Sequence, residues 1–147
     1  MSLEIKSGIS IPETHIDLLE EAICVALITV MANGQPQASV VWCNFDGTHI
    51  KINTARGRLK ERNMRTRPMA TILAVDSKNP YRYLEIRGSV EEITEKGAIE
   101  HRNELGELYL GKSNYYGETG IGPDEPSENN IRVVCKIKPK KVIAVNH

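Results

Sequence analysis

The chain is poor in aromatic residues, with one Trp, one Phe and five Tyr among its 147 residues. Proteins that bind single-stranded nucleic acid stack its bases on grouped aromatic side chains, and these seven are scattered. Net charge is also absent, because 19 acidic residues balance 19 basic ones. A neutral protein lacks the general positive field that attracts nucleic acid or anionic membranes. The composition therefore predicts a protein that binds neither.

Cysteine is scarce as well. Cys24, Cys43 and Cys135 are odd in number, far apart and without C-x-x-C spacing, so neither a disulfide framework nor a zinc knuckle is expected. Cys24 and Cys135 lie in apolar runs and are predicted to be buried thiols. The four histidines lack the H-x-x-x-H and H-E-x-x-H spacings, and no carboxylate cluster accompanies them, so no metal site is predicted.

Long apolar runs are missing too. The longest, residues 22–31, is too short to span a bilayer and lacks the flanking features of a signal peptide, so we expect a cytoplasmic protein. The G-x-S-x-G elbow of hydrolases and the G-x-G-x-x-G turn of Rossmann domains are absent. At 147 residues and 40% hydrophobic content, the chain suits a single domain over residues 1–147 with an ordinary core.

Strand-like segments make up much of the chain. Apolar and β-branched patterns predict six strands, at residues 23–31, 35–45, 49–54, 69–76, 81–93 and 131–145. Turns at Asn33-Gly34 and Asp46-Gly47 predict that the first three form an antiparallel meander. Gly88 suggests a bulge that curves the sheet. Short helices are expected at residues 10–22, within 56–67 and at 94–110. These elements predict a small antiparallel barrel, whose poorly covered apolar faces favour a homodimer.

Residues 106–113 match the phosphate-loop pattern G-x-x-x-x-G-K-S. That loop works after a buried strand and before a helix, whereas here it ends a helix. Gly111 is better explained as the C-terminal glycine of that helix.

Residues 56–67 hold six of the 19 basic residues and only one acidic residue. The segment lies where a strand passes into a helix, and basic side chains with free backbone N–H groups at such a junction suit phosphate. The alternation of Arg56, Arg58, Lys60 and Arg62 lets only two or three converge on one spot. A phosphate site, a solvated helix face and a nucleic-acid patch remain open on this pattern, with nucleic acid the least favoured.

Five segments, taken in order, resemble a known family: residues 34–42, Asp46-Gly47, residues 53–63, residues 67–70 and residues 79–88. Together they are similar to the pyridoxamine 5′-phosphate oxidase-like split-barrel superfamily, over about residues 12–145. More narrowly, they resemble its flavin/deazaflavin oxidoreductase branch, which uses FMN or coenzyme F-420. The resemblance implies a six-stranded antiparallel split β-barrel, mainly β with short helices, that forms a homodimer with the cofactor at the interface.

The resemblance also implies the cofactor-binding residues: Gln37, Ser39, Val41, Asn53, Thr54, Ala55, Arg58, Lys60, Asn63, Arg82 and Tyr83. Arg58 and Lys60 would bind the phosphate, with Arg56 and Arg62 as helpers and Asn63 one helical turn beyond. Residues 53–55 would run along the ring system. Residues 37, 39 and 41 share one strand face and would approach its pyrimidine edge. Arg82 and Tyr83 would come from the other subunit.

The implied function is hydride transfer from a phosphorylated flavin or deazaflavin to a small conjugated or aromatic compound. The alternative is a non-catalytic flavin- or small-ligand-binding protein. Both FMN and F-420 present phosphate, so the basic segment does not distinguish them. No residue stands out as a catalytic acid or base. Tyr115 and Tyr116, in the loop of residues 111–130, either cover the site or are exposed loop aromatics. The chain lacks the extended C-terminal segment with which true pyridoxamine-phosphate oxidases hold their substrate.

Overall fold

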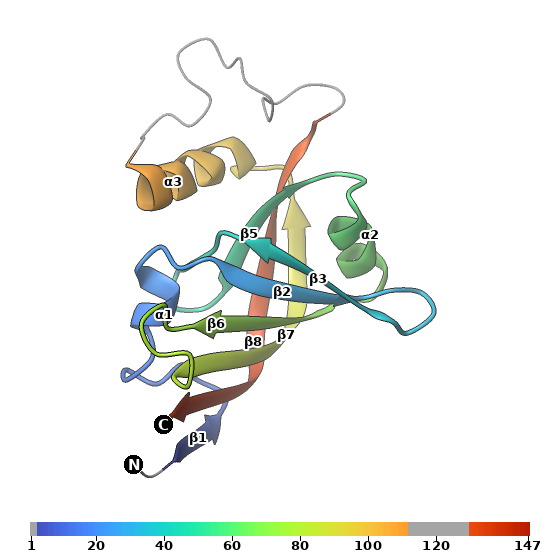
Figure 1. The fold of residues 1–147 in the computed structure, drawn as a ribbon. Helices are drawn as coiled ribbons and strands as arrows, with labels where there is room; N and C mark the ends of the chain where they lie inside the picture. Colours follow the sequence, from blue (N-terminus) through green and yellow to red (C-terminus); the bar gives the residue numbers. More distant parts are fainter. Residues whose placement is uncertain (1–2, 112–129) are drawn as a thin grey trace.

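The computed structural model describes residues 3–111 and 130–147 (Figure 1). In this part of the chain, eight strands and three helices follow one another in this order: β1 Glu4–Gly8, α1 Asp17–Glu20, β2 Val25–Val30, β3 Pro36–Val41, β4 Asn44–Phe45, β5 Ile50–Ala55, α2 Leu59–Thr66, β6 Met69–Val75, β7 Tyr83–Thr94, α3 Ala98–Leu110 and β8 Arg132–Asn146.

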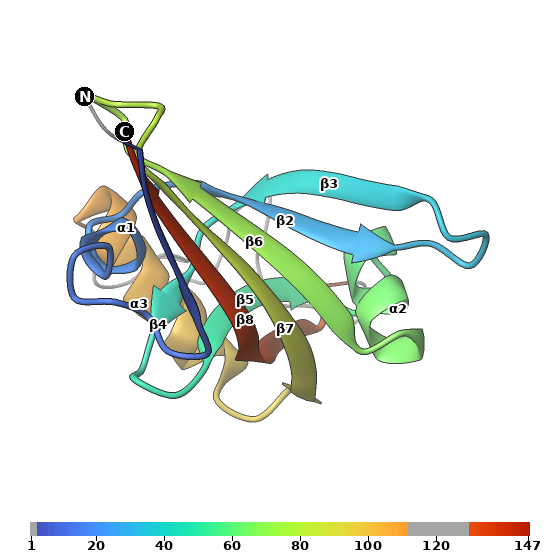
Figure 2. The same ribbon diagram turned by 90° about the horizontal axis from the view of Figure 1, so that it is seen from below.

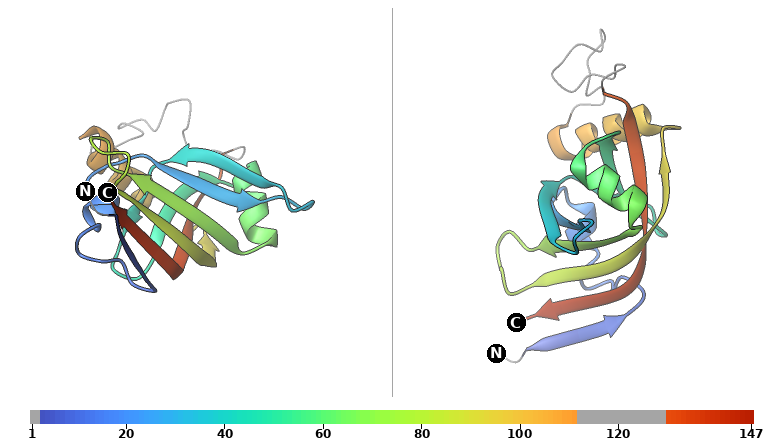
Figure 3. Two further views of the ribbon diagram at one scale, coloured as in Figure 1. Left: turned by 60° about the horizontal axis from the view of Figure 1, so that its bottom comes forward. Right: turned by 90° about the vertical axis from the view of Figure 1, so that its right-hand side faces the viewer.

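All eight strands belong to one antiparallel sheet, with the order β3-β2-β6-β7-β8-β5-β4 and with β1 added along β8. The sheet is strongly curled (Figure 2), with α1 and α3 toward one end of the curl and α2 toward the other. Its end strands, β3 and β4, are not paired with each other, so the barrel is split rather than closed. The two termini lie close together, where β1 runs beside the end of β8 (Figure 3).

A bulge at Gly88 helps to curve the long β7–β8 ladder. The register shifts between Arg87 and Gly88, so that Arg87 pairs with Lys141 but Gly88 pairs with Pro139. A Cβ atom on residue 88 would lie 2.6 Å from Ile137 Cγ2 and 2.8 Å from the Lys138 carbonyl oxygen. Only glycine permits so close a backbone approach, and the predicted bulge is confirmed.

The core fills the inside of the curl. It is built from alternate residues of the strands, among them the fully buried Leu27, Ile52, Ile72, Ile86 and Ile137. This is the period-two pattern expected of strands with one face in the core. Side chains from α1 and α2 join the same cluster, so the helices complete the core that the sheet begins.

The prediction of six strands is wrong in number, because β1 and β4 are additional strands. Both hairpins of the predicted meander are present, as β2–β3 and β4–β5, but its middle strand is divided into β3 and β4. β3 pairs only with β2, whereas β5 pairs with β8 and β4 at the opposite end of the sheet. The turn at Asp46-Gly47 joins β4 to β5 and not β3 to β5. The first helix is shorter than residues 10–22, because the chain before it forms turns with hydrogen bonds from residue i to residue i−3, such as that from the His15 N–H to the Pro12 carbonyl.

Two other local predictions are confirmed. Gly111 adopts a left-handed conformation, with φ of 71°, directly after α3, as expected of a helix C-terminal glycine. Asn33-Gly34 lies in the β2–β3 hairpin loop, where Gly34 has φ of 88°. Tyr115, Tyr116 and most of the loop of residues 111–130 lie outside the described residues.

Candidate functional site: a cationic cavity

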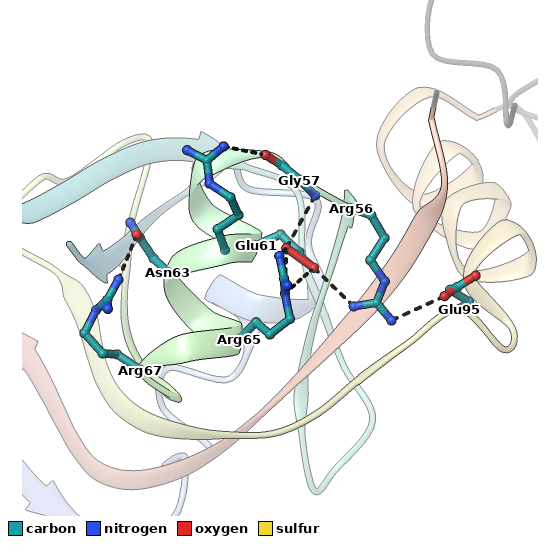
Figure 4. Close-up of polar contacts among 8 residues, drawn as sticks. Arg56, Gly57, Glu61, Asn63, Arg65, Arg67 and Glu95 are labelled. Atoms are coloured by element: carbon teal, nitrogen blue, oxygen red, sulfur yellow. Dashed lines mark hydrogen bonds and ion pairs between the residues drawn. The ribbon is translucent and has the colours of Figure 1, made fainter. Parts of the chain in front are cut away.

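A buried carboxylate, that of Glu61, binds two of the six cations of residues 56–67. Glu61 is fully buried on α2 and accepts hydrogen bonds from Arg56 Nη1 at 3.1 Å and Arg65 Nη2 at 3.0 Å. Arg56 also reaches Glu95 at 3.4 Å (Figure 4). Burial alone would raise the pKa of Glu61, but the hydrogen bonds from Arg65, Arg56 and the Gly57 N–H outweigh it and lower that pKa. Two of the six cations therefore stabilise the strand-to-helix turn.

Two more cations bind backbone and side-chain oxygens nearby. Arg62 donates from Nη1 to the Gly57 carbonyl at 3.0 Å. Arg67 donates from Nε to the Val30 carbonyl at 2.7 Å and from Nη2 to Asn63 Oδ1 at 3.2 Å. The expected helpers Arg56 and Arg62 thus both have partners within the turn. Arg58 and Lys60 line a cavity beside the start of α2.

This cavity has a volume of about 230 Å³ and opens beside the start of α2. Strands β3, β5 and β8 and helix α3 all contribute to its wall. The described residues that line it are Cys24, Val40, Val41, Trp42, Asn53, Thr54, Arg58, Lys60, Arg102, Leu105 and Arg132. Four of these side chains are cationic and none is acidic, so the cavity suits an anion.

Five of the predicted cofactor-binding residues meet here: Val41, Asn53, Thr54, Arg58 and Lys60. They come from two strands and a helix start that are well separated in sequence. Their convergence follows from the curl of the sheet, which brings the end of β3 and the end of β5 to the same cavity. Contact of these residues with a cofactor stays a prediction.

Four other predicted residues are not among those that line the cavity. Gln37 accepts a hydrogen bond from Thr29 at 2.7 Å, and Asn63, which is buried, donates to the same threonine at 3.0 Å. Ser39 and Val41 share the inner face of β3, and Ala55 is buried next to Thr54. This hydrogen-bonded set connects α2 to the β2–β3 hairpin and so supports the position of Lys60.

The last two predicted residues lie at the start of β7, outside the cavity of the same subunit. Arg82 forms ion pairs with Asp17 at 2.5 Å and Asp76 at 3.1 Å, which connect α1 to the β6–β7 turn. Tyr83 lines a shallow groove on the outer face of the sheet. Their expected contribution from a second subunit stays a prediction.

The hydroxyl group of Thr54 is the clearest sign of a ligand. Thr54 is 1% exposed, lines the cavity and has no hydrogen-bond partner for its Oγ1 among the described residues. A buried hydroxyl without a partner costs about 1–3 kcal/mol. Such a group is normally satisfied by a ligand or an ordered water.

Several wall residues were not predicted from the sequence. Arg132 begins β8 opposite Ala55, and it is only 4% exposed. Cys24 was expected to be buried but is exposed at the cavity, because it precedes β2 and does not lie within it. No short-range pattern marks either residue, since each meets the basic segment only through the curl of the sheet.

An aromatic stack forms another part of the wall. Trp42 and Tyr109 stack with centroids 4.8 Å apart, and the Arg102 guanidinium lies 5.0 Å from the Trp42 ring. The Tyr109 hydroxyl donates to the Ile23 carbonyl at 2.8 Å and accepts from the Cys43 N–H at 3.1 Å. These contacts hold α3 against the strands and give the cavity one rigid side.

The cavity lowers the pKa of Lys60. Desolvation lowers its pKa first, and the charges of Arg58 and Arg132 lower it further. An anion bound between these groups would reverse that electrostatic effect.

Within residues 3–111 and 130–147, no group of three His, Cys, Asp or Glu side chains is placed to hold a metal ion. No helix in this part of the chain is long and apolar enough to cross a membrane.

Comparison with known proteins agrees with this geometry. The model of the family described as Pyridoxamine 5′-phosphate oxidase matches residues 11–146. No curated protein matches the chain. Among solved structures, an F-420 reductase is 30% identical, with 90% of this chain and 98% of that one covered and a TM-score of 0.74.

Two further solved structures extend the comparison. A conserved hypothetical protein from Mycobacterium tuberculosis is 25% identical, with coverage of 91% and 84% and a TM-score of 0.69. The heme storage protein HutZ from Vibrio cholerae is 16% identical, with coverage of 86% and 88% and a TM-score of 0.60, which shows a shared fold. With its curled, split antiparallel sheet and a family match over nearly its whole length, the chain belongs to the pyridoxamine 5′-phosphate oxidase family.

Proposed function

We propose that the protein is an oxidoreductase that binds FMN or F-420 by its phosphorylated group in the cationic cavity. The acceptor of the hydride would be a small conjugated or aromatic compound. The family match and the 30% identity to an F-420 reductase support this class of cofactor. The observation that carries the proposal is the buried Thr54 hydroxyl, without a partner among the described residues, in the same cavity as Arg58 and Lys60.

The residues present fit such a cofactor. Arg58 and Lys60 would hold the phosphorylated group, because charge-assisted hydrogen bonds from cations are the strongest phosphate contacts a protein makes. Thr54 would hydrogen-bond a more buried polar atom, and Val41 offers an apolar surface. The bound cofactor supplies the hydride chemistry, while these side chains bind and orient it.

A second copy of the chain would complete the site. The cavity volume of about 230 Å³ is below the roughly 300–1,000 Å³ of small-molecule pockets. The outer face of β2, β6 and β7 carries a shallow apolar groove of about 500 Å³, lined by residues that include Ile28, Leu73, Val75 and Tyr83. Contiguous apolar surface of this kind commonly marks an interface between subunits. We therefore propose a homodimer in which this outer face is covered and Tyr83 approaches the partner's cavity.

Titration of the purified protein with FMN, F-420 and riboflavin tests cofactor binding, monitored by flavin or deazaflavin fluorescence. We expect Lys60→Ala to weaken FMN binding by about tenfold or more and to leave riboflavin binding nearly unchanged, because riboflavin lacks the phosphate. Arg62→Ala is the matched control, since Arg62 belongs to the same segment but contacts the Gly57 carbonyl. Binding of neither FMN nor F-420 by the unmodified protein would refute the proposal.

Catalysis is tested separately from binding. The reduced cofactor is added with the protein and a panel of conjugated or aromatic acceptors, and cofactor oxidation is followed under anaerobic conditions. Turnover that exceeds the rate without protein supports an oxidoreductase. Tight binding without turnover of any acceptor would favour the alternative, a non-catalytic flavin-binding protein.

A further inference from the structure

Arg132 is a third cation at the position where Arg58 and Lys60 meet. It lies at the start of β8, opposite Ala55 at the end of β5, and it is 4% exposed. It lines the same cavity, and its charge contributes to the lowered pKa of Lys60. Three cations so close together repel one another, so their convergence suits a bound anion better than the empty cavity.

Asn53 holds this guanidinium in place. Its Oδ1 accepts a hydrogen bond from Arg132 Nε at 2.9 Å. Its Nδ2 donates to the Ala98 carbonyl at 2.8 Å and to His101 Nδ1 at 3.1 Å. Both amide hydrogens thus have acceptors on α3. The side-chain carbonyl is therefore directed at Arg132.

His101 determines this orientation of the Asn53 side-chain amide, because it contacts the amide nitrogen. The ring is 3% exposed, and its Nε2 donates to Asn44 Oδ1 at 2.8 Å, so Nδ1 is an acceptor. Burial lowers the pKa of His101 to about 3, with smaller contributions from the charges of Lys51, Arg102 and Arg132. The imidazole is therefore neutral at neutral pH, and Nδ1 can accept only from the Asn53 amide. Buried or half-buried groups on β4, α3, β5 and β8 form one chain that reaches Arg132, whose Nη1 also donates to Asn130 Oδ1 at 3.4 Å.

We propose that Arg132 is a third ligand of the phosphate held by Arg58 and Lys60, and that Asn53 is a positioning residue for Arg132. The inference rests on the proposed function, because it assumes a phosphorylated cofactor in the cavity. It gives Asn53 a different task from the contact with the ring system that the family resemblance implies. Arginine suits this task, since its planar fork carries several N–H donors and can bind more than one oxygen acceptor at the same time.

The test compares affinities for FMN and riboflavin, or for F-420 and its dephosphorylated deazaflavin core. We expect Arg132→Gln to weaken binding of the phosphorylated member of the pair by about tenfold or more, with less than about a twofold change for the other. Lys136→Gln is the matched control, because it removes one positive charge from the same strand, where Lys136 pairs with Glu92 at 3.5 Å. It should change neither affinity.

A second variant separates loss of the phosphate contact from general misfolding, which is needed because Arg132 is buried. Arg132→Lys retains the charge but lacks the Nε group that Asn53 holds, so we expect a smaller loss that is again specific to the phosphorylated ligand. Equal losses for both ligands in Arg132→Lys and Arg132→Gln, or no loss in either, would overturn the proposal. If Lys60→Ala abolishes the preference for the phosphorylated ligand and Arg132→Gln preserves it, the inference about Arg132 is overturned and the proposed function is not. Failure of the unmodified protein to bind either cofactor would overturn the proposed function as well.

The positioning role of Asn53 is tested by a double-mutant cycle. Asn53→Ala should weaken FMN binding several-fold in the unmodified background, by roughly a single hydrogen bond, and should have little further effect when Arg132→Gln is already present. Riboflavin affinity should stay unchanged throughout. If Asn53→Ala weakens riboflavin binding as much as FMN binding, Asn53 contacts the ring system and does not act through Arg132.

Discussion

At the scale of single residues, Glu61 decides what the basic segment can do. A fully buried carboxylate on α2 needs several donors, and Arg56, Arg65 and the Gly57 N–H supply them. Arg58 and Lys60 lie at the start of the same helix and line the cavity. The high local density of positive charge is therefore partly structural, and the phosphate proposal rests on two residues of the segment.

The lowered pKa of Lys60 predicts a pH dependence of cofactor binding. A bound phosphate stabilises the ammonium form, so the pKa of Lys60 is higher in the complex than in the free protein. Affinity for FMN should then be constant below the pKa of the free protein and fall as the pH rises through it, at a lower pH than an ordinary lysine would give. Measured dissociation constants from about pH 7 to about pH 10 check this.

The variant Lys60→Arg provides the control for this pH dependence, because arginine stays protonated throughout the range. Its affinity for FMN should fall less over the same interval, and riboflavin should show no such fall with either protein. The same decline in Lys60→Arg would show that another group titrates.

At the scale of elements, the β7–β8 ladder connects the cavity to the rest of the sheet. β8 begins with Arg132 in the cavity wall and ends at Asn146 beside β1, while β7 pairs with it along nearly its whole length. The bulges in this ladder bend the long strand β8, which pairs with β5 near its start and with β1 near its end. The position of Arg132 relative to β5 therefore depends on the curvature that the ladder adopts.

Gly88→Ala should disturb this ladder. The added Cβ would lie within 3.0 Å of both Ile137 Cγ2 and the Lys138 carbonyl oxygen, and a backbone oxygen in a ladder cannot move aside easily. We expect the free energy of unfolding to fall by about 1–3 kcal/mol, as for other overpacked sites, measured by denaturant unfolding. Gly8→Ala, which meets nothing within 4 Å, should change it by less than about 0.5 kcal/mol. Comparable stability of the two variants would contradict the steric argument.

At the scale of the whole molecule, the sheet has one face in the core and one outer face that is apolar over parts of β2 and β6. Met69 is 53% exposed and Val40 is 74% exposed, and Ile28, Leu73 and Val75 are half-buried. A chain of this length has too few helices to cover both faces of a curled sheet. This surplus of apolar surface is the physical basis for the proposed dimer.

Leu73→Lys tests the proposed interface. A charge in the middle of the outer face would be desolvated without a partner in the dimer, so we expect monomers where the unmodified protein forms dimers. Analytical ultracentrifugation measures the change, and circular dichroism verifies the fold. Ile99→Lys, at an exposed position on α3, is the control and should leave the dimer intact. A stable dimer of folded Leu73→Lys would mean that the outer face is not the interface.

The local features were predictable from the sequence because their causes are local. Alternating apolar residues predicted where the main strands lie, and glycines predicted the hairpin loop, the bulge at Gly88 and the end of α3. Strand periodicity and turn conformation depend on neighbours within a few residues, so a short window of sequence contains the information. The ordered motifs also indicated the family, which the comparison confirms.

Only the tertiary structure decided which distant residues meet. The expected middle strand is divided into β3 and β4 at opposite ends of the sheet, and β5 pairs with β8, which places Arg132 opposite Ala55. The same curl exposed Cys24 at the cavity and brought Asn53 between Arg132 and His101. Hydrogen bonds and ion pairs between such residues depend on sheet order and curvature, which no local pattern encodes. The sequence by itself thus indicated the main strands, the turns and the family, and the fold of the sheet decided which residues line the cavity.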